Sequence, residues 1–127
     1  LEANIQTALR ECNYGRWNGL ALKNVTASEP DAVARWLSDL SAAPHGGETL
    51  ADLSRRVSAW IDETLAGRGR AVAVTHASVI RAAIVHVLEA PATAFWRIDI
   101  EPLSIVTVTS DGRVRKLRFP PSHIQTS

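Results

Sequence analysis

The pattern of apolar and polar residues predicts two helices, a strand, a third helix and then antiparallel strands. A short apolar run, residues 71–75, is made of small and β-branched residues, which is typical of a strand buried on both faces. From Ser78 the apolar residues fall at helical spacing, and Pro91 ends this helix. Ser78 is therefore expected to cap the helix, and His76 is expected at the carboxyl end of the strand.

Two further helices are predicted upstream. The first begins within residues 28–31, where a serine cap is followed by a proline in the first turn and a carboxylate three residues after the cap. It is expected to end near Ser41. The second begins after Thr49, with Asp52 at the reciprocal capping position, and Gly67 ends it. Each helix carries an apolar stripe that predicts the face packed on the core.

The charged residues of the second helix are expected to face solvent. Asp52 and Arg56 lie one turn apart, so they are predicted to pair, which contributes at most about 0.5 kcal/mol. The remaining charged positions of this face are Arg55, Asp62 and Glu63.

Strands are predicted near both ends of the chain, which makes the fold class α/β. Residues 5–9 indicate a short lead-in strand, and residues 95–100 alternate between apolar and polar side chains. Two more strands, residues 104–109 and 114–119, flank a tight turn at residues 111–112.

Composition and charge argue against several classes of protein. The 127 residues carry a formal net charge of +1, which gives no electrostatic case for binding nucleic acid or a membrane surface. The single cysteine, Cys12, leaves no internal disulfide and no cysteine cluster for a metal, and it is expected to be a packed loop residue. No metal-ligand spacing, signal-peptide pattern or membrane-spanning run occurs. We therefore expect a cytoplasmic protein without a metal or cofactor.

His76 is the first candidate for chemistry. A residue at a strand end in an open α/β sheet lies in the crevice where ligands bind. The start of the following helix adds free N–H groups and a partial positive charge, which favour an anion such as phosphate. The alternative is a histidine that bonds a neighbouring residue and has no further role, and from this stretch alone both interpretations stay open.

Two glycine-rich loops carry the other candidates. The first, residues 11–19, combines Glu11 with aromatic residues such as Tyr14, as binding loops often do. The alternative is a structural loop that its aromatic residues anchor. The second loop, residues 42–48, places His45 beside two glycines, where it could either reach a ligand or stay solvated.

Three motifs occur in the order found in the histidine phosphatase (phosphoglycerate mutase-like) superfamily. Residues 9–19 resemble its L-x-E-x-x-[FY]-G-x-W-x-G loop, and residues 44–49 with the following helix resemble its P-G-G-E-S…R segment. Residues 72–81 resemble its V-x-V-[ST]-H-[GA]-x-x-[IL]-R strand and helix. The resemblance extends over residues 9–119.

This resemblance implies a phosphoglycerate mutase-like three-layer α/β/α sheet, with residues 1–121 as a partial domain and residues 122–127 as a loose tail. It also implies hydrolysis of a small phosphorylated substrate through a phosphohistidine intermediate. By motif match, Glu11 donates a proton to the leaving group and His76 holds the phosphate. The residues expected to bind substrate or phosphate are Tyr14, Gly15, His45, Ala77 and Ser78.

The family's Arg-His-Gly motif, which carries the nucleophile, does not occur in the 127 residues, nor does its Ser-Pro-Leu-x-Arg-Ala segment. Both are expected upstream of Leu1, in roughly 50–70 residues, together with the strands that would flank residues 71–75. The interval between Glu11 and His76 is short. It favours an α-ribazole-phosphatase-like or broad-specificity small phosphatase over a phosphoglycerate mutase.

Two other functions stay open. A truncated, non-catalytic relative could bind a phosphorylated ligand or form a homodimer through unpaired edges beside residues 71–75. An unrelated phosphate- or nucleotide-binding α/β module is the third hypothesis, although the sequence has no glycine-rich phosphate loop after a strand.

Overall fold

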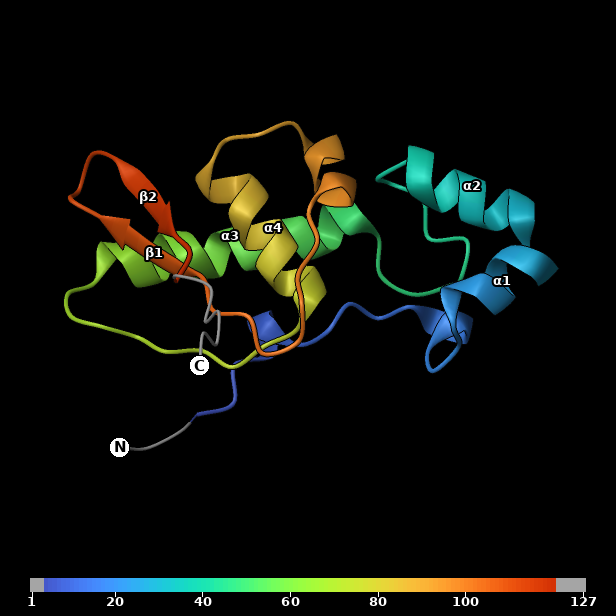
Figure 1. The fold of residues 1–127 in the computed structure, drawn as a ribbon, viewed down its shortest axis with the longest axis horizontal. Coiled ribbons are helices and arrows are strands. Elements are labelled where there is room, and N and C mark those ends of the chain that lie inside the picture. The colour runs from blue at the N-terminus through green and yellow to red at the C-terminus, as the bar shows by residue number, and fades with distance from the viewer. Residues whose placement is uncertain (1–3, 121–127) are drawn as a thin grey trace, which may run out of the picture.

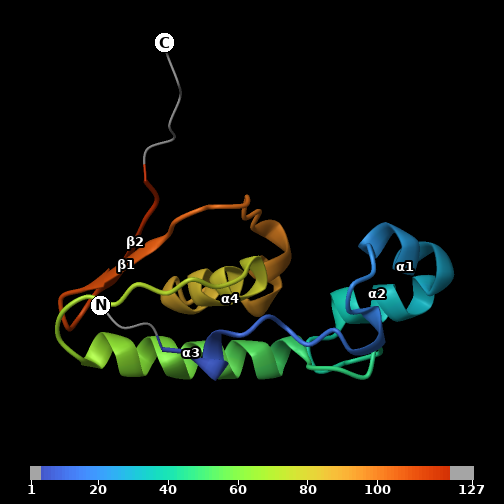
Figure 2. The ribbon, with the colours of Figure 1, turned by 90° about the horizontal axis from the view of Figure 1, so that it is seen from below.

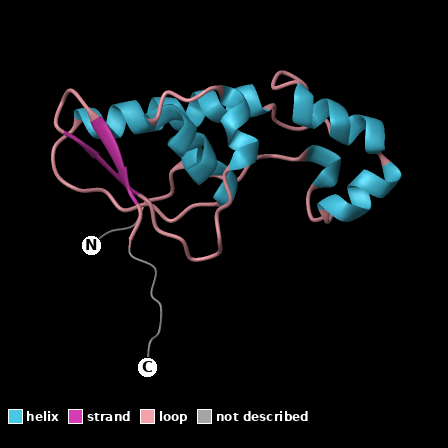
Figure 3. Ribbon diagram, turned by 45° about the horizontal axis from the view of Figure 1, so that its top comes forward, coloured by secondary structure: helices cyan, strands magenta, loops and turns pink. Residues whose placement is uncertain are grey.

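Two stacked helices form the centre of the computed structural model, which describes residues 4–120 (Figure 1). The helix α3 runs the length of one side, and α4 lies against it, while α1 and α2 form a separate lobe at one end (Figure 2). The hairpin of β1 and β2 packs at the other end (Figure 3). The helices and strands are α1 (Leu22–Ser28), α2 (Pro30–Ser38), α3 (Leu50–Ala66), α4 (Ala77–Val87), β1 (Thr107–Ser110) and β2 (Arg115–Arg118), with 3₁₀ turns at Thr7–Leu9, Gly15–Trp17 and Ala92–Arg97.

The helix α3 forms as its sequence predicts. The Thr49 side chain accepts a hydrogen bond from the main-chain N–H of Asp52 at 3.0 Å, and Gly67 follows the last turn. The apolar side chains at helical spacing are the buried ones, namely Leu50, Leu53, Val57 and Ile61. These side chains pack with α4 and the N-terminal loop in one core, so a local pattern of caps and apolar positions accounts for the longest element.

The predicted start and end of α2 are wrong. Ser28 does not cap α2, because it is the last residue of α1, a helix that the sequence pattern did not predict, and its hydroxyl bonds back to the carbonyl of Asn24 at 3.1 Å. The residue before the first turn of α2 is Glu29. The helix ends at Ser38 and not near Ser41, since the Asp39 carboxylate accepts the N–H of Ser41 in a turn.

Two of the predicted strands, at residues 5–9 and 71–75, are absent from the described residues. Residues 5–9 contain a 3₁₀ turn. Residues 71–75 are extended but find no ladder partner within residues 4–120, and Val72 and Val74 are 93% and 97% exposed. A strand forms only where a neighbouring strand satisfies its backbone N–H and C=O groups. The apolar pattern of residues 71–75 could not show whether such a neighbour is present.

The predicted strand at residues 95–100 is also wrong. The chain forms a 3₁₀ turn at Ala92–Arg97, which buries Phe95. Arg81 of α4 holds this turn by donating to the carbonyl of Ile98 at 2.6 Å and by lying 5.9 Å from the centroid of the Phe95 ring. The buried side chain is thus Phe95, which is out of phase with the alternating residues, and Trp96 is exposed.

The C-terminal hairpin confirms the predicted antiparallel pair, with shorter strands. Thr107 lies opposite Arg118, and the pairing continues to the turn. The Asp111 carboxylate accepts two main-chain N–H groups in that turn, which gives it the tight geometry that the Asp-Gly sequence predicts. The predicted tail, residues 122–127, lies outside the described residues. Within residues 4–120, every helix is too short or too polar to cross a membrane.

Candidate active site

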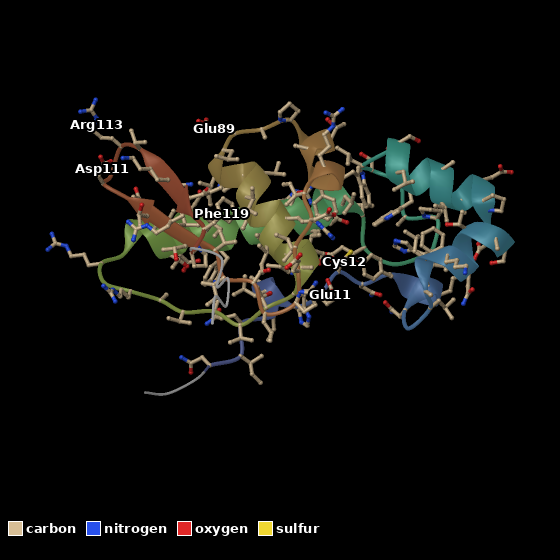
Figure 4. All side chains as sticks on the ribbon, viewed as in Figure 1. Glu11, Cys12, Glu89, Asp111, Arg113 and Phe119 are labelled. Carbon is tan, nitrogen blue, oxygen red and sulfur yellow. The ribbon has the colours of Figure 1, made fainter. Side chains whose placement is uncertain are left out.

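Glu11 and His76 meet at the N-terminal end of α4. The carboxylate Oε2 of Glu11 lies 3.9 Å from Nδ1 of His76. Their side chains are 43% and 52% exposed, so a solvent-borne molecule has access to both. Glu11 comes from the loop that precedes the 3₁₀ turn Gly15–Trp17, and Figure 4 shows it below α4, with the hairpin-tip residues Asp111 and Arg113 at the far end of the molecule. Folding thus joins the two residues that the sequence motifs identify.

Ser78 is buried beside this pair and bonds to the Glu11 carboxylate. Its hydroxyl donates to Oε1 of Glu11, and the same oxygen accepts the main-chain N–H of Cys12 at 2.8 Å. The prediction that Ser78 caps α4 is wrong, because His76 occupies the cap position and Ala77 begins the helix. In this arrangement Ser78 orients the Glu11 carboxylate, and Ala77 is the first residue of α4.

The two glycine-rich loops lock together through their main chains. The N–H of Arg16 donates to the carbonyl of His45 at 3.0 Å, and the N–H of Glu48 donates to the carbonyl of Asn13 at 2.7 Å. At Gly15, where φ is +53°, a Cβ atom would come within 2.7 Å of the main-chain nitrogen of Gly47. Gly15 is therefore required for the close approach of the two loops.

His45 is buried, in contrast to both roles that the sequence left open for it. Its ring packs edge-on to Tyr14, Trp17 and Trp36, with ring centroids 6.0, 5.0 and 4.5 Å away. Nδ1 accepts the N–H of Gly47 at 2.9 Å, and Nε2 has no hydrogen-bond partner among the described residues. Burial lowers the pKa of His45, and the charge of Arg16 lowers it further, so this histidine is neutral at pH 7.

Tyr14 belongs to the aromatic cluster around His45, and Cys12 follows Glu11 in the same loop. Burial raises the pKa of the Tyr14 phenol to about 12, and the pKa of the Cys12 thiol also to about 12. Both groups therefore stay protonated near neutral pH. Cys12 is a packed loop residue, as expected, since only 2% of it is exposed.

The predicted pairing of Asp52 with Arg56 is wrong. Asp52 pairs with Arg55 at 2.8 Å, on the exposed side of α3. The Arg56 side chain is only 14% exposed and pairs with Glu48 at 2.7 Å, so it does not belong to a solvated face. Sequence spacing could not identify this pair, because its partners lie on a loop and a helix whose relative placement depends on the fold.

A surface hollow of about 600 Å³ lies beside the second loop, and Arg10, Gly46 and Arg55 contribute to its lining. Among residues 4–120, no group of three or more His, Cys, Asp or Glu side chains is arranged to hold a metal ion.

Two known proteins are similar in sequence to most of this chain. A bifunctional protein of Mycobacterium tuberculosis is 31% identical over 116 residues, which cover 88% of this chain and 32% of that protein. Glucosyl-3-phosphoglycerate phosphatase of Mycolicibacterium vanbaalenii is 35% identical over 97 residues, covering 69% of this chain and 43% of the relative. The chain therefore spans less than half the length of either relative.

Solved structures of two phosphatases also align with most of this chain. A mycobacterial glucosyl-3-phosphoglycerate phosphatase in complex with VO3 aligns with a TM-score of 0.77 and 26% identity, over 94% of this chain and 63% of the other. The α-ribazole phosphatase of Shigella flexneri aligns with a TM-score of 0.76 and 20% identity, over 94% and 60%. These alignments confirm the α/β fold class. The family model of the histidine phosphatase superfamily (branch 1) matches residues 1–120, and the chain belongs to that superfamily.

Proposed function

We propose that this chain supplies the proton donor and a phosphate-holding histidine of a phosphomonoesterase that works through a phosphohistidine. The observation that carries the proposal is the meeting of Glu11 and His76 at 3.9 Å, at a helix N-terminus open to solvent. A carboxylic acid and an imidazole beside free helix N–H groups suit a departing alkoxide and a phosphoryl group.

The proposed reaction has two steps and needs the histidine nucleophile of the family's Arg-His-Gly strand. In the first step the nucleophile's ring nitrogen bonds to phosphorus, the ester P–O bond breaks, and Glu11 gives its proton to the leaving alkoxide. In the second step water attacks phosphorus, Glu11 takes a proton from that water, and the P–N bond breaks to release phosphate. His76 and the N–H groups at the start of α4 hold the phosphoryl oxygens throughout.

We propose a small phosphorylated molecule as the substrate, in an α-ribazole-phosphatase-like or broad-specificity enzyme and not a mutase. The short interval between Glu11 and His76 supports an open pocket, and relatives are named as phosphatases of different compounds. A cytoplasmic location, expected from the sequence, stays a prediction.

A crystal structure of the full-length protein with orthovanadate tests this proposal. Vanadate is expected with an oxygen about 3 Å from a ring nitrogen of His76 and next to Glu11. Vanadate bound only in the hollow beside Arg10 and Arg55 would contradict the proposed site.

A second candidate function is self-association. Val72 and Val74 are almost fully exposed on an extended segment that has no ladder partner within residues 4–120. An unpaired apolar edge of this kind favours pairing with another chain.

A further inference from the structure

Arg56 reaches from α3 into the buried side of the loop that carries Glu11. Its side chain is 14% exposed, and that of its partner Glu48 is 9% exposed. The pair is bidentate, with Nε donating to one carboxylate oxygen at 2.7 Å and Nη2 donating to the other at 3.0 Å. This fork geometry fixes the guanidinium plane more firmly than a single ion pair would.

The remaining N–H groups of Arg56 hold the main chain around the proposed acid. Nη1 donates to the carbonyl of Ala8 at 2.6 Å, and Nη2 donates to the carbonyl of Glu11 at 3.3 Å. On the far side of the acid, the N–H of Glu48 donates to the carbonyl of Asn13 at 2.7 Å. The ion pair therefore contacts the loop before, at and after Glu11.

We propose that Arg56 is a positioning residue for the Glu11 carboxyl, which it holds in register with His76 by fixing the main chain on both sides of the acid. This inference rests on the proposed function. The carboxyl group itself is oriented by Ser78 and by the N–H of Cys12, and both bonds require the Glu11 main chain to stay in place. A displacement of about 1 Å in such a group can cost roughly 100-fold in rate.

The charges at this position agree with a fixed pair. Burial alone would raise the pKa of Glu48, but the hydrogen bonds and positive charge of Arg56 more than offset it, so this pKa lies below its ordinary value. Glu48 therefore stays ionised at neutral pH. It holds Arg56 in the orientation that its main-chain contacts need.

The test separates positioning of the acid from simple support of the fold. A nitrophenolate leaves without a proton, whereas a simple alkoxide needs one, so loss of the acid slows alkyl phosphate hydrolysis far more than 4-nitrophenyl phosphate hydrolysis. A variant that merely lowers the folded fraction slows both reactions equally. The ratio of the two kcat/KM values is therefore the decisive quantity, because kcat/KM reports the first step, whereas the second step is the same for both substrates.

The variant is Arg56→Lys in the full-length protein, because lysine keeps the charge opposite Glu48 but cannot bond to all these acceptors at once. The matched control is Arg55→Lys, at the exposed neighbouring position, and Glu11→Gln is the reference. We expect Arg56→Lys to lower kcat/KM for an alkyl phosphate on the order of 10- to 100-fold, with little change in kcat/KM for 4-nitrophenyl phosphate. Arg55→Lys should change neither.

The outcomes separate the two proposals. If Glu11→Gln leaves the ratio unchanged, the proposed function is wrong. If Glu11→Gln changes the ratio and Arg56→Lys does not, the positioning role is wrong. The double variant should be no slower on the alkyl phosphate than Glu11→Gln alone, because both changes remove one effect. If Arg56→Lys does not fold, Glu48→Gln takes its place, and an equal loss on both substrates then overturns the inference.

Discussion

Replacing Gly47 with alanine should separate the two loops that support Glu11. A Cβ atom at Gly47 would lie 2.5 Å from the main-chain nitrogen of Gly15 and would overlap the carbonyl of Asn13, where ordinary contact begins near 3.4 Å. Both neighbours are main chain, so the loops must move apart by about 1 Å. Overpacking together with a weakened hydrogen bond between the loops should lower the free energy of unfolding by about 2–4 kcal/mol.

Two other glycines separate the causes of this loss. Gly67→Ala meets only one atom, at 3.5 Å, on ordinary backbone, so the free energy of unfolding should change by less than about 0.5 kcal/mol. Gly19 has φ of +77° and open space around it, so alanine there should cost about 1–2 kcal/mol from backbone strain alone. Gly15→Ala combines strain and overlap and should cost the most.

Urea unfolding followed by tryptophan fluorescence measures these differences, because Trp17 and Trp36 are buried beside the loops. The variants should shift the midpoint without changing the slope of the transition. Equal midpoints for Gly47→Ala and Gly67→Ala would show that the loops are not in the contact described here.

The remaining predictions concern pH and self-association. The pKa of Glu48 is below its ordinary 4.5 in the folded protein, so its pairing with Arg56 stabilises the fold fully above that pH and is lost as the pH falls through the lower folded pKa. Between about pH 6 and pH 3, the urea midpoint of the wild type should therefore fall more than that of Glu48→Gln, and parallel falls would refute this. If residues 71–75 pair between chains, sedimentation of the 127-residue polypeptide should give a mass that rises with concentration above 13.8 kDa and returns to it in Val74→Lys. A constant mass of 13.8 kDa would exclude that pairing.

Local signals predicted the elements that local interactions stabilise. The helix α3 depends on a Thr49 cap and an apolar stripe within its own sequence, so its bounds were predicted almost to the residue. The hairpin turn depends on Asp111 bonding to the next residues and was also predicted. The strands predicted at residues 71–75 and 95–100 do not form in the described residues, because a strand depends on a partner and the second segment contains a 3₁₀ turn that packs against α4.

The candidate site divides in the same way. Glu11 and His76 were identified from motifs, and the structure brings them together. The orientation of the Glu11 carboxyl by Ser78 and the support of its loop by Arg56 involve residues far apart in sequence. Those contacts could not be predicted from spacing, since an arginine on a charged helix face is more often solvated than buried.

The central claim is that Glu11 is the proton donor of a phosphatase site, and Glu11→Gln in the full-length protein tests it most directly. Glutamine keeps the shape of the side chain and can accept from Ser78, but it has no acidic proton to give. We predict that kcat/KM for an alkyl phosphate falls by about 10²–10⁴-fold, while kcat/KM for 4-nitrophenyl phosphate is largely retained because its leaving group needs no proton in the first step. An unchanged rate on the alkyl phosphate would contradict the claim.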